Sequence, residues 1–285
     1  MVVLSEQEWR ARAEAHRERV EAWTGPHLAR RRERIADPVE DFLFTYYGFS
    51  PGRLVQWHPG AGVVLAGATG FGPGYRDCAQ GAALDLDSVL PQRRAAIEWT
   101  RELLAATAAR PPHLGCFGMH EWAMVYRTPA AEIRHSASPL RLTPAEIEAV
   151  VDQRGVRCSH FDAFRFFTPP ARPLNLLQPT RDRQRDLEQP GCLHANMDLY
   201  KWAYKLSPLI GSELVADCFA LARDVRTMDM RASPYDLSDL GHRPITVETP
   251  EGRAEYAALQ RGFADRAAPL RQRLLDDCSG LLAPA

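Results

Sequence analysis

Lysine is almost absent from this chain of 285 residues. Of its 35 lysine and arginine residues, two are lysines, Lys201 and Lys205, and the rest are arginines. An arginine serves for any surface charge, whereas a lysine can lose its proton in a buried site and act as a base or an amine nucleophile. Although a coding bias explains the many arginines, the two remaining lysines are candidates for chemistry.

Long apolar runs are absent as well. No stretch of 18 or more apolar residues occurs, and the first residues contain no apolar signal core, so we expect a cytoplasmic protein without a membrane partner. The six cysteines are widely spaced and form no CxxC pair, which argues against a disulfide framework and a zinc ribbon. The net charge of −1 gives no general attraction to nucleic acid, so such binding would need a local patch.

Helical patterns dominate what is present. Ser5 and Glu8 form a capping-box pattern, and Thr143 followed by Pro144 is typical of a helix start. The sequence predicts helices over 5–36 with an interruption at Gly25-Pro26, and over 38–47, 87–109, 143–155, 192–205, 214–230 and 249–282, the last kinked at Pro269. The predicted class is mainly α, a compact multi-helix domain with a small extended portion near 53–75 and 154–170. We expect charged helices at 1–36 to pack on a single main domain of residues 37–285.

One predicted helix carries a polar stripe through apolar surroundings. His194, Asp198, Lys201 and Lys205 follow helical spacing and fall on one narrow face, with aromatic residues on both sides. The stripe is either a solvated seam or the wall of a pocket. In a pocket, a carboxylate beside an amine has perturbed titration, which suits general acid/base or Schiff-base chemistry.

Candidates to approach this stripe are Asp162, Tyr46 and Tyr47. The alternative is a surface ion pair between Asp198 and Lys201, which would contribute a few tenths of a kcal/mol. The burial of the stripe therefore decides between catalysis and solvation.

Three cysteine and histidine pairs recur along the chain: Cys116 with His120, Cys158 with His160, and Cys192 with His194. If these segments converge, the three histidines with Asp162 or Asp198 would form a His/carboxylate site for a divalent transition metal. The alternative is that each histidine is a hydrogen-bonded residue of the core.

Arginines alternate with phenylalanines between residues 157 and 185. Arg165 and its neighbours could contact phosphates while the phenylalanine rings stack on bases, which would make the chain a nucleic-acid-binding module. The alternative interpretation places the rings in the core and the arginines in solvent.

Four segments resemble a family of actinobacterial proteins that carries the name 3-methyladenine DNA glycosylase. They are "PVEDFLFTYY", "GCFGMHEWAMVYR", "CSHFDAFRFFTPPARPLN" and "QPGCLHANMDLYKWAYKLSP", and the resemblance extends over nearly the whole chain. It implies an enzyme of DNA repair, a hydrolase that releases alkylated purines, with damaged DNA as its partner and no cofactor.

Under this resemblance, the site needs aromatic faces for a cationic base and a carboxylate to stabilise the developing sugar cation. Asp198 or Asp162 would be the carboxylate, and Lys201 would attack the sugar carbon or contact a phosphate. The candidates for substrate binding are Tyr46, Tyr47, Trp122, Tyr200, Trp202 and Arg165. The competing hypothesis is a metal-dependent enzyme on a small polar substrate, built from His120, His160, His194 and nearby carboxylates.

Overall fold

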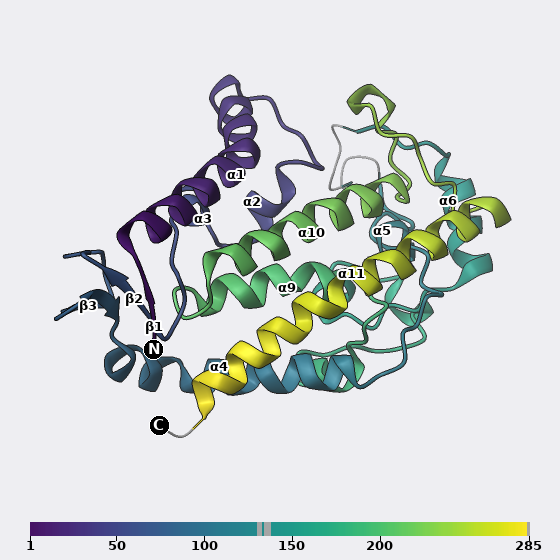
Figure 1. The fold of residues 1–285 in the computed structure, drawn as a ribbon. Helices are drawn as coiled ribbons and strands as arrows, with labels where there is room; N and C mark the ends of the chain where they lie inside the picture. The colour runs from purple at the N-terminus through teal and green to yellow at the C-terminus, as the bar shows by residue number, and fades with distance from the viewer. Residues whose placement is uncertain (130–132, 134–137, 284–285) are drawn as a thin grey trace. The chain divides into compact units, whose positions relative to one another are not determined.

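Helices make up most of the protein (Figure 1). The computed structural model describes residues 1–129, 133 and 138–283. A small four-stranded sheet accompanies the helices in these residues, which confirms the predicted mainly α class with a small β portion.

The chain forms two compact units. The first comprises Met1–Leu104, Leu199–Ala220 and Leu270–Ala285, and the second comprises Ala105–Asp198 and Leu221–Pro269. The unit boundaries fall inside helices α4 (Leu86–Ala108), α9 (Leu193–Leu206), α10 (Ser212–Arg231) and α11 (Pro250–Leu282). The expected packing of residues 1–36 on a domain of residues 37–285 stays a prediction.

The sheet belongs to the first unit. Its strands are β1 (Val2–Leu4), β2 (Val63–Ala66), β3 (Tyr75–Cys78) and β4 (Gly81–Leu84), in the order β1-β2-β4-β3, with β1 parallel to β2 and the other pairs antiparallel. The prediction of extended structure near 53–75 is therefore right for β2, whereas Pro51–Val55 forms a short helix, α3. The sequence did not predict β1, because a three-residue strand has no pattern of its own.

Helix α1 (Glu6–Glu33) follows β1 directly, and the capping box of Ser5 and Glu8 is present as predicted. The predicted interruption at Gly25-Pro26 is wrong, because the helix continues through Pro26. A proline removes one backbone hydrogen bond. Tertiary contacts on either side offset this loss, since Thr24 and His27 are buried and His27 Nδ1 lies 2.8 Å from a carboxylate oxygen of Asp41.

Aromatic rings fill the centre of the first unit. Helix α2 (Phe42–Tyr46) is shorter than the predicted helix over 38–47, and it is preceded by turns in which the Asp37 side chain accepts hydrogen bonds from the backbone of Val39 and Glu40. Rings after α2 and on α9 and α10 contact one another at centroid distances between 4.9 and 6.5 Å. These rings belong to Tyr47, Phe49, Tyr200, Tyr204 and Phe219.

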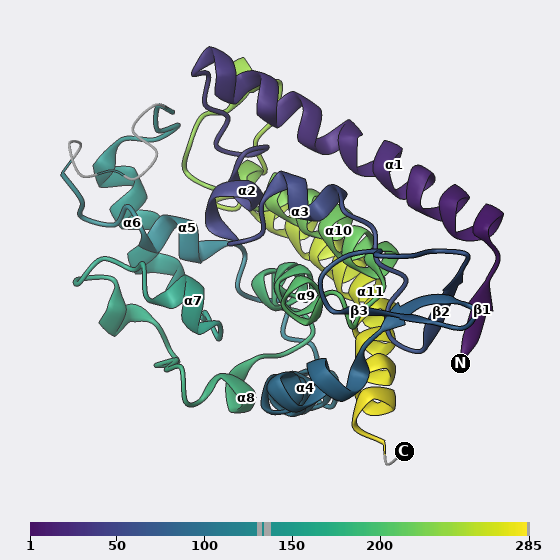
Figure 2. The same cartoon turned by 90° about the vertical axis from the view of Figure 1, so that its left-hand side faces the viewer.

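The second unit is built from shorter elements. These are α5 (Met119–Ala123), α6 (Pro144–Arg154), α7 (Phe161–Phe164), α8 (Gln184–Leu187) and the 3-10 helices Arg172–Leu174 and Ser238–Leu240. Both views show α5 beside α6 (Figures 1 and 2). Thr143 caps α6 as predicted, with Pro144 in its first turn.

The predicted extended stretch over 154–170 is right in part, because residues 155–160 are non-helical with one β-bridge, whereas α7 and turns follow. A single bridge between Val156 and Asn175 is its extended contact in the described residues. The Asn175 side chain bonds the backbone of Cys158 in both directions, at 2.7 and 2.9 Å, and so replaces a strand partner with side-chain contacts.

The long predicted helices are confirmed as α4, α9, α10 and α11. Helix α11 continues through Pro269 as one element. None of the helices in the described residues has the length and apolar character that a membrane crossing requires.

Candidate metal centre

Three histidines from distant segments meet in the second unit. His120 lies on α5, His160 directly precedes α7, and His194 lies in the first turn of α9. The ring centroid of His194 is 4.4 Å from that of His120 and 5.3 Å from that of His160. The imidazoles therefore form a row with His194 in the middle, and each end of the row meets carboxylates.

The first carboxylate is Asp229, near the end of α10. His120 Nε2 lies 2.9 Å from Oδ1 and 3.1 Å from Oδ2 of Asp229, and both side chains are buried. One possible ligand atom from each of His120, His194 and Asp229 lies within 4.8 Å of the other two. We call these three residues the proximal set.

A buried ion network holds the proximal set in place. Arg226 lies one turn before Asp229 on α10, and its Nη1 is 3.7 Å from Asp229 Oδ2. The same nitrogen donates a hydrogen bond of 3.1 Å to Oε1 of Glu121, which is the neighbour of His120 on α5. The network joins α5 to α10 and so orients both His120 and Asp229.

The surroundings shift the pKa values of the two histidines of the proximal set in opposite directions. Burial alone would lower the pKa of His120, but the charge and hydrogen bond of Asp229 raise it overall. Burial, aided by His120 and His160, lowers the pKa of His194 well below its ordinary value. His194 is therefore a neutral imidazole at pH 7, which is the form that binds metals.

A second group lies at the other end of the row. His160 Nε2 is 3.3 Å from Glu188 Oε1 and 3.3 Å from Asp198 Oδ2, and one possible ligand atom of each residue lies within 4.8 Å of the others. The three residues are buried, with exposed fractions of 1%, 2% and 2% in chain order. We call them the distal set.

A small cavity adjoins the proximal set. Its volume is about 20 Å³, and its wall includes His120 and His194 together with three thiols, those of Cys116, Cys158 and Cys192. The pKa of each thiol is raised by burial, to about 12 for Cys158, so the thiols are neutral. A cavity of this size holds about one water molecule.

The donor types of both sets suit a first-row transition metal. Each set combines imidazole with carboxylate, and neither contains a thiol. Metal sites with three protein ligands and free space are typical of catalysis, whereas structural zinc sites use four protein ligands. Since the cavity adjoins His120 and His194, the proximal set matches the first arrangement.

The predicted stripe on α9 runs from buried to exposed. Asp198 is buried and His194 is half-buried, while Lys201 is half-buried and Lys205 is exposed. The ammonium groups of the two lysines lie 4.8 and 5.3 Å from the ring centroid of Trp202. His194 and Asp198 are thus in the two ligand sets, and neither set contains Lys201.

Asp162 and Arg165 lie outside both sets. Arg165 Nε is 3.4 Å from Asp162 Oδ1, and the Arg165 guanidinium stacks 4.1 Å from the centroid of the Phe166 ring. Arg181 lies 3.8 Å from the same carboxylate oxygen. Asp162 is therefore a partner of arginines in this structure.

The predicted aromatic candidates are packed against their neighbours. Tyr47 and Tyr200 are buried in the ring cluster of the first unit, and Tyr46 stacks on Phe42 at 4.9 Å. Trp202 is also buried and contacts Trp99 at 4.8 Å. Their roles as binding residues stay predictions.

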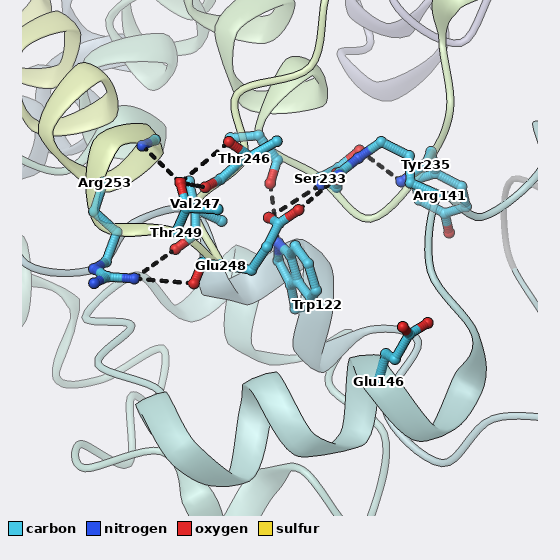
Figure 3. A network of polar contacts seen from close by, with 12 residues as sticks. Trp122, Arg141, Glu146, Ser233, Tyr235, Thr246, Val247, Glu248, Thr249 and Arg253 are labelled. Atoms are coloured by element: carbon cyan, nitrogen blue, oxygen red, sulfur yellow. Dashed lines mark hydrogen bonds and ion pairs between the residues drawn. The ribbon is translucent and has the colours of Figure 1, made fainter.

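Trp122 belongs to a structural network in the second unit (Figure 3). Its Nε1 donates to the carbonyl of Ala232, and the Arg141 guanidinium lies 5.8 Å from its ring centroid. Arg141 in turn donates to Glu248 at 2.8 Å and to the carbonyl of Ser233 at 3.2 Å. The ring is completely buried and serves as a packing surface for Arg141.

Sequence reasoning missed Asp229, Glu188 and the pair of Glu121 with Arg226. One signal for Asp229 was available, because Arg226 and Asp229 are charged residues inside the apolar stretch of a predicted helix. Such charges are rarely buried unless they are paired or bind a metal. Glu188 follows a short helix among surface acids and has no distinguishing pattern.

Comparisons with known proteins found no relative. No family model matches the chain, and no curated protein and no solved structure matches it. The resemblance to the glycosylase family stays a prediction, and the function has to be inferred from the site.

Proposed function

We propose that the chain is a metal-dependent enzyme that acts on a small polar substrate, with its metal ion held by the proximal set. One observation carries this proposal. The possible ligand atoms of His120, His194 and Asp229 lie within 4.8 Å of one another beside a cavity.

The spacing of the donor atoms supports metal binding. Ligand atoms about 2.1 Å from an ion lie about 3.0 Å apart at octahedral angles and about 3.4 Å apart at tetrahedral angles. The distances of 2.9 and 3.1 Å between His120 Nε2 and the Asp229 oxygens are close to the octahedral value. The proton between these groups would leave when an ion binds, so metal binding releases protons.

The chemistry of the proximal set depends on the ion and on the residues around it. A bound ion would activate water or polarise a substrate oxygen. The neutral thiols and the side chain of Tyr256 line the cavity. Arg226 and Glu121 hold Asp229 and His120 in position, which is the usual function of groups outside the ligand shell.

The glycosylase activity remains a separate candidate that rests on the sequence resemblance. Base release is also a hydrolysis, and it would make damaged DNA the partner of a cytoplasmic protein. The cavity of about 20 Å³ is much smaller than a purine, so a base would need a different pocket or an enlarged cavity. A small polar substrate would need less enlargement of the cavity than a purine would.

Metal analysis of the purified protein tests the proposal. Metal-depleted protein is incubated with Co²⁺ or Zn²⁺, dialysed, and analysed for elements, and the variants His194→Gln and Asp229→Asn are compared with the control His242→Gln, which is outside both sets. We expect at least one tightly held ion per chain in wild type and control, and affinity weakened at least tenfold in His194→Gln and Asp229→Asn. A folded wild-type protein that retains no ion would refute the proposal.

A second assay separates the two candidate activities. Alkylated DNA is incubated with metal-loaded protein, with metal-depleted protein and with Asp198→Asn, and released 3-methyladenine is measured. Base release that is undiminished in Asp198→Asn would exclude the role of Asp198 that the resemblance implies. Base release that persists without metal would support a glycosylase that does not use the proximal set.

A further inference from the structure

We infer that the distal set, His160, Glu188 and Asp198, binds a second metal ion, so that the centre is dinuclear. This inference rests on the proposed function and extends it to a second ion. Two-metal centres stabilise the attacking and leaving oxygens of a displacement together, so with both ions bound the substrate would be an ester or a phosphoryl compound that water hydrolyses.

Two distances within the distal set match those between ligands of one ion. The two contacts of His160 Nε2, with Glu188 and Asp198, both measure 3.3 Å. Charge-assisted hydrogen bonds between nitrogen and oxygen are about 2.7–2.9 Å long. The observed separations lie between the octahedral and tetrahedral values for ligands about 2.1 Å from an ion, so His160 Nε2 is at ligand spacing from each carboxylate, and all three ligand atoms lie within 4.8 Å of one another.

Burial gives the second argument. Two carboxylates and an imidazole are placed together where each residue is at most 2% exposed. Carboxylates that approach each other in a region of low dielectric repel strongly, and a divalent cation between them converts this repulsion into attraction. Gln184 Nε2 donates a hydrogen bond of 2.6 Å to Glu188 Oε1, and a cation between the two carboxylates would further offset the cost of burying them.

The position of the distal set beside the proximal set gives the third argument. Helix α9 contributes His194 to the proximal set and Asp198 to the distal set, and these residues are four apart, so they lie one above the other on one face of the helix. The His160 and His194 rings stack at 5.3 Å with an interplanar angle of 27°. The two sets therefore share helix α9 and are neighbours in the second unit.

The two sets differ in donor type. The proximal set offers two imidazoles and one carboxylate, whereas the distal set offers one imidazole and two carboxylates. Nitrogen donors favour zinc, copper, iron and nickel, and carboxylates favour harder ions such as manganese and magnesium. The distal set should therefore bind Mn²⁺ relatively better than the proximal set does.

Metal stoichiometry tests the inference. Metal-depleted full-length protein is titrated with Co²⁺, which is followed by visible absorption, and elemental analysis then gives the number of ions per chain. The variant Asp198→Asn removes a distal ligand, Asp229→Asn removes a proximal ligand, and Asp186→Asn makes the same change at an exposed aspartate outside both sets. Circular dichroism shows which variants are folded, and the wild-type stoichiometry is informative even if a variant is not.

We expect two ions per chain in wild type and in Asp186→Asn, and one in Asp198→Asn and in Asp229→Asn. One ion per chain in wild type that Asp198→Asn retains would overturn the dinuclear centre and leave the proposed function intact. A single ion that depends on Asp198 and not on Asp229 would instead support the distal site and overturn the proximal one. The absence of bound ions would overturn both.

Discussion

The interiors of the two units contain different kinds of buried side chain. In the first unit, the centre is a cluster of rings, in which Tyr200 touches Tyr47, Phe49 and Phe219. The interior of the second unit instead holds titratable side chains. These are the histidines at 120, 160 and 194, the carboxylates of Glu121, Glu188, Asp198 and Asp229, and the Arg226 guanidinium.

This difference indicates that the first interior serves stability and that the second serves another purpose. Apolar burial is favourable and depends little on direction, so rings alone suffice to hold a core. Buried charges gain stability over an apolar core only rarely, and their removal from a pair is costly. The second unit keeps seven buried titratable groups beside the half-buried His194, and we infer that the reason is metal binding and not stability.

We expect the largest loss of unfolding free energy when a buried guanidinium of the second unit is removed. Arg226→Met keeps an unbranched apolar side chain but leaves the carboxylates of Glu121 and Asp229 buried without their guanidinium. We expect metal-depleted protein at pH 7 to lose about 3–5 kcal/mol of unfolding free energy, measured by urea denaturation.

The control for this change is Arg266→Met, which breaks an ion pair with Asp224 in which both side chains are about half exposed. Exposed pairs contribute up to about 1 kcal/mol, so the control should change little. Equal losses in both variants would show that the interior charges have no special role in stability.

His58 in the first unit has its pKa shifted in the opposite direction to that of His120. Burial, with a smaller effect of His16, lowers the pKa of His58 from 6.5 to about 4. Between these values the unfolded chain takes up a proton and the native chain does not, so stability falls as the pH decreases from about 6.5 toward 4.

We expect His58→Gln to lose less stability than wild type between pH 7 and pH 4.5. The difference should be about 2 kcal/mol, because a shift of one pKa unit corresponds to about 1.4 kcal/mol. Urea denaturation of both proteins at the two pH values measures it. Parallel losses in the two proteins would contradict a neutral native His58.

We expect an intermediate loss of stability when a methyl group is added where two backbone segments of the second unit are in close contact. A methyl group on Gly252, in the first turn of α11, would lie 2.0 Å from the carbonyl oxygen of Thr246. Gly252→Ala should cost about 1–3 kcal/mol because one of the two segments must shift. Gly262→Ala, on the same helix with no atom within 4 Å of the new methyl, should stabilise by up to about 1 kcal/mol. Thermal unfolding distinguishes the two, and a stabilised Gly252→Ala would contradict the close contact.

We expect the smallest change in stability when the Tyr200 hydroxyl is removed from the ring cluster. Tyr200 Oη is buried and makes no hydrogen bond within the described residues. Tyr200→Phe removes a desolvated polar group and keeps the ring, so we expect a change within about 1 kcal/mol in the direction of higher stability. Urea denaturation measures it, and a loss above 2 kcal/mol would show that the hydroxyl has a partner.

Local signals in the sequence were sufficient for most of the helices. The capping boxes at Ser5 and Thr143 and the periodic apolar residues of the long helices act over a few residues, so the chain itself specifies them. The predictions failed where tertiary contacts override local preference. Pro26 lies inside a helix, and Asn175 replaces a strand partner for Cys158.

By itself, the sequence determined the mainly α class and directed attention to His120, His160 and His194. Only the tertiary structure decided which carboxylates lie beside them, because Glu188 and Asp229 come from segments with no shared pattern. Hydrogen-bonding periodicity is local and can be read along the chain, whereas the convergence of side chains depends on how distant helices pack. The ligand sets could therefore be recognised only in the folded protein.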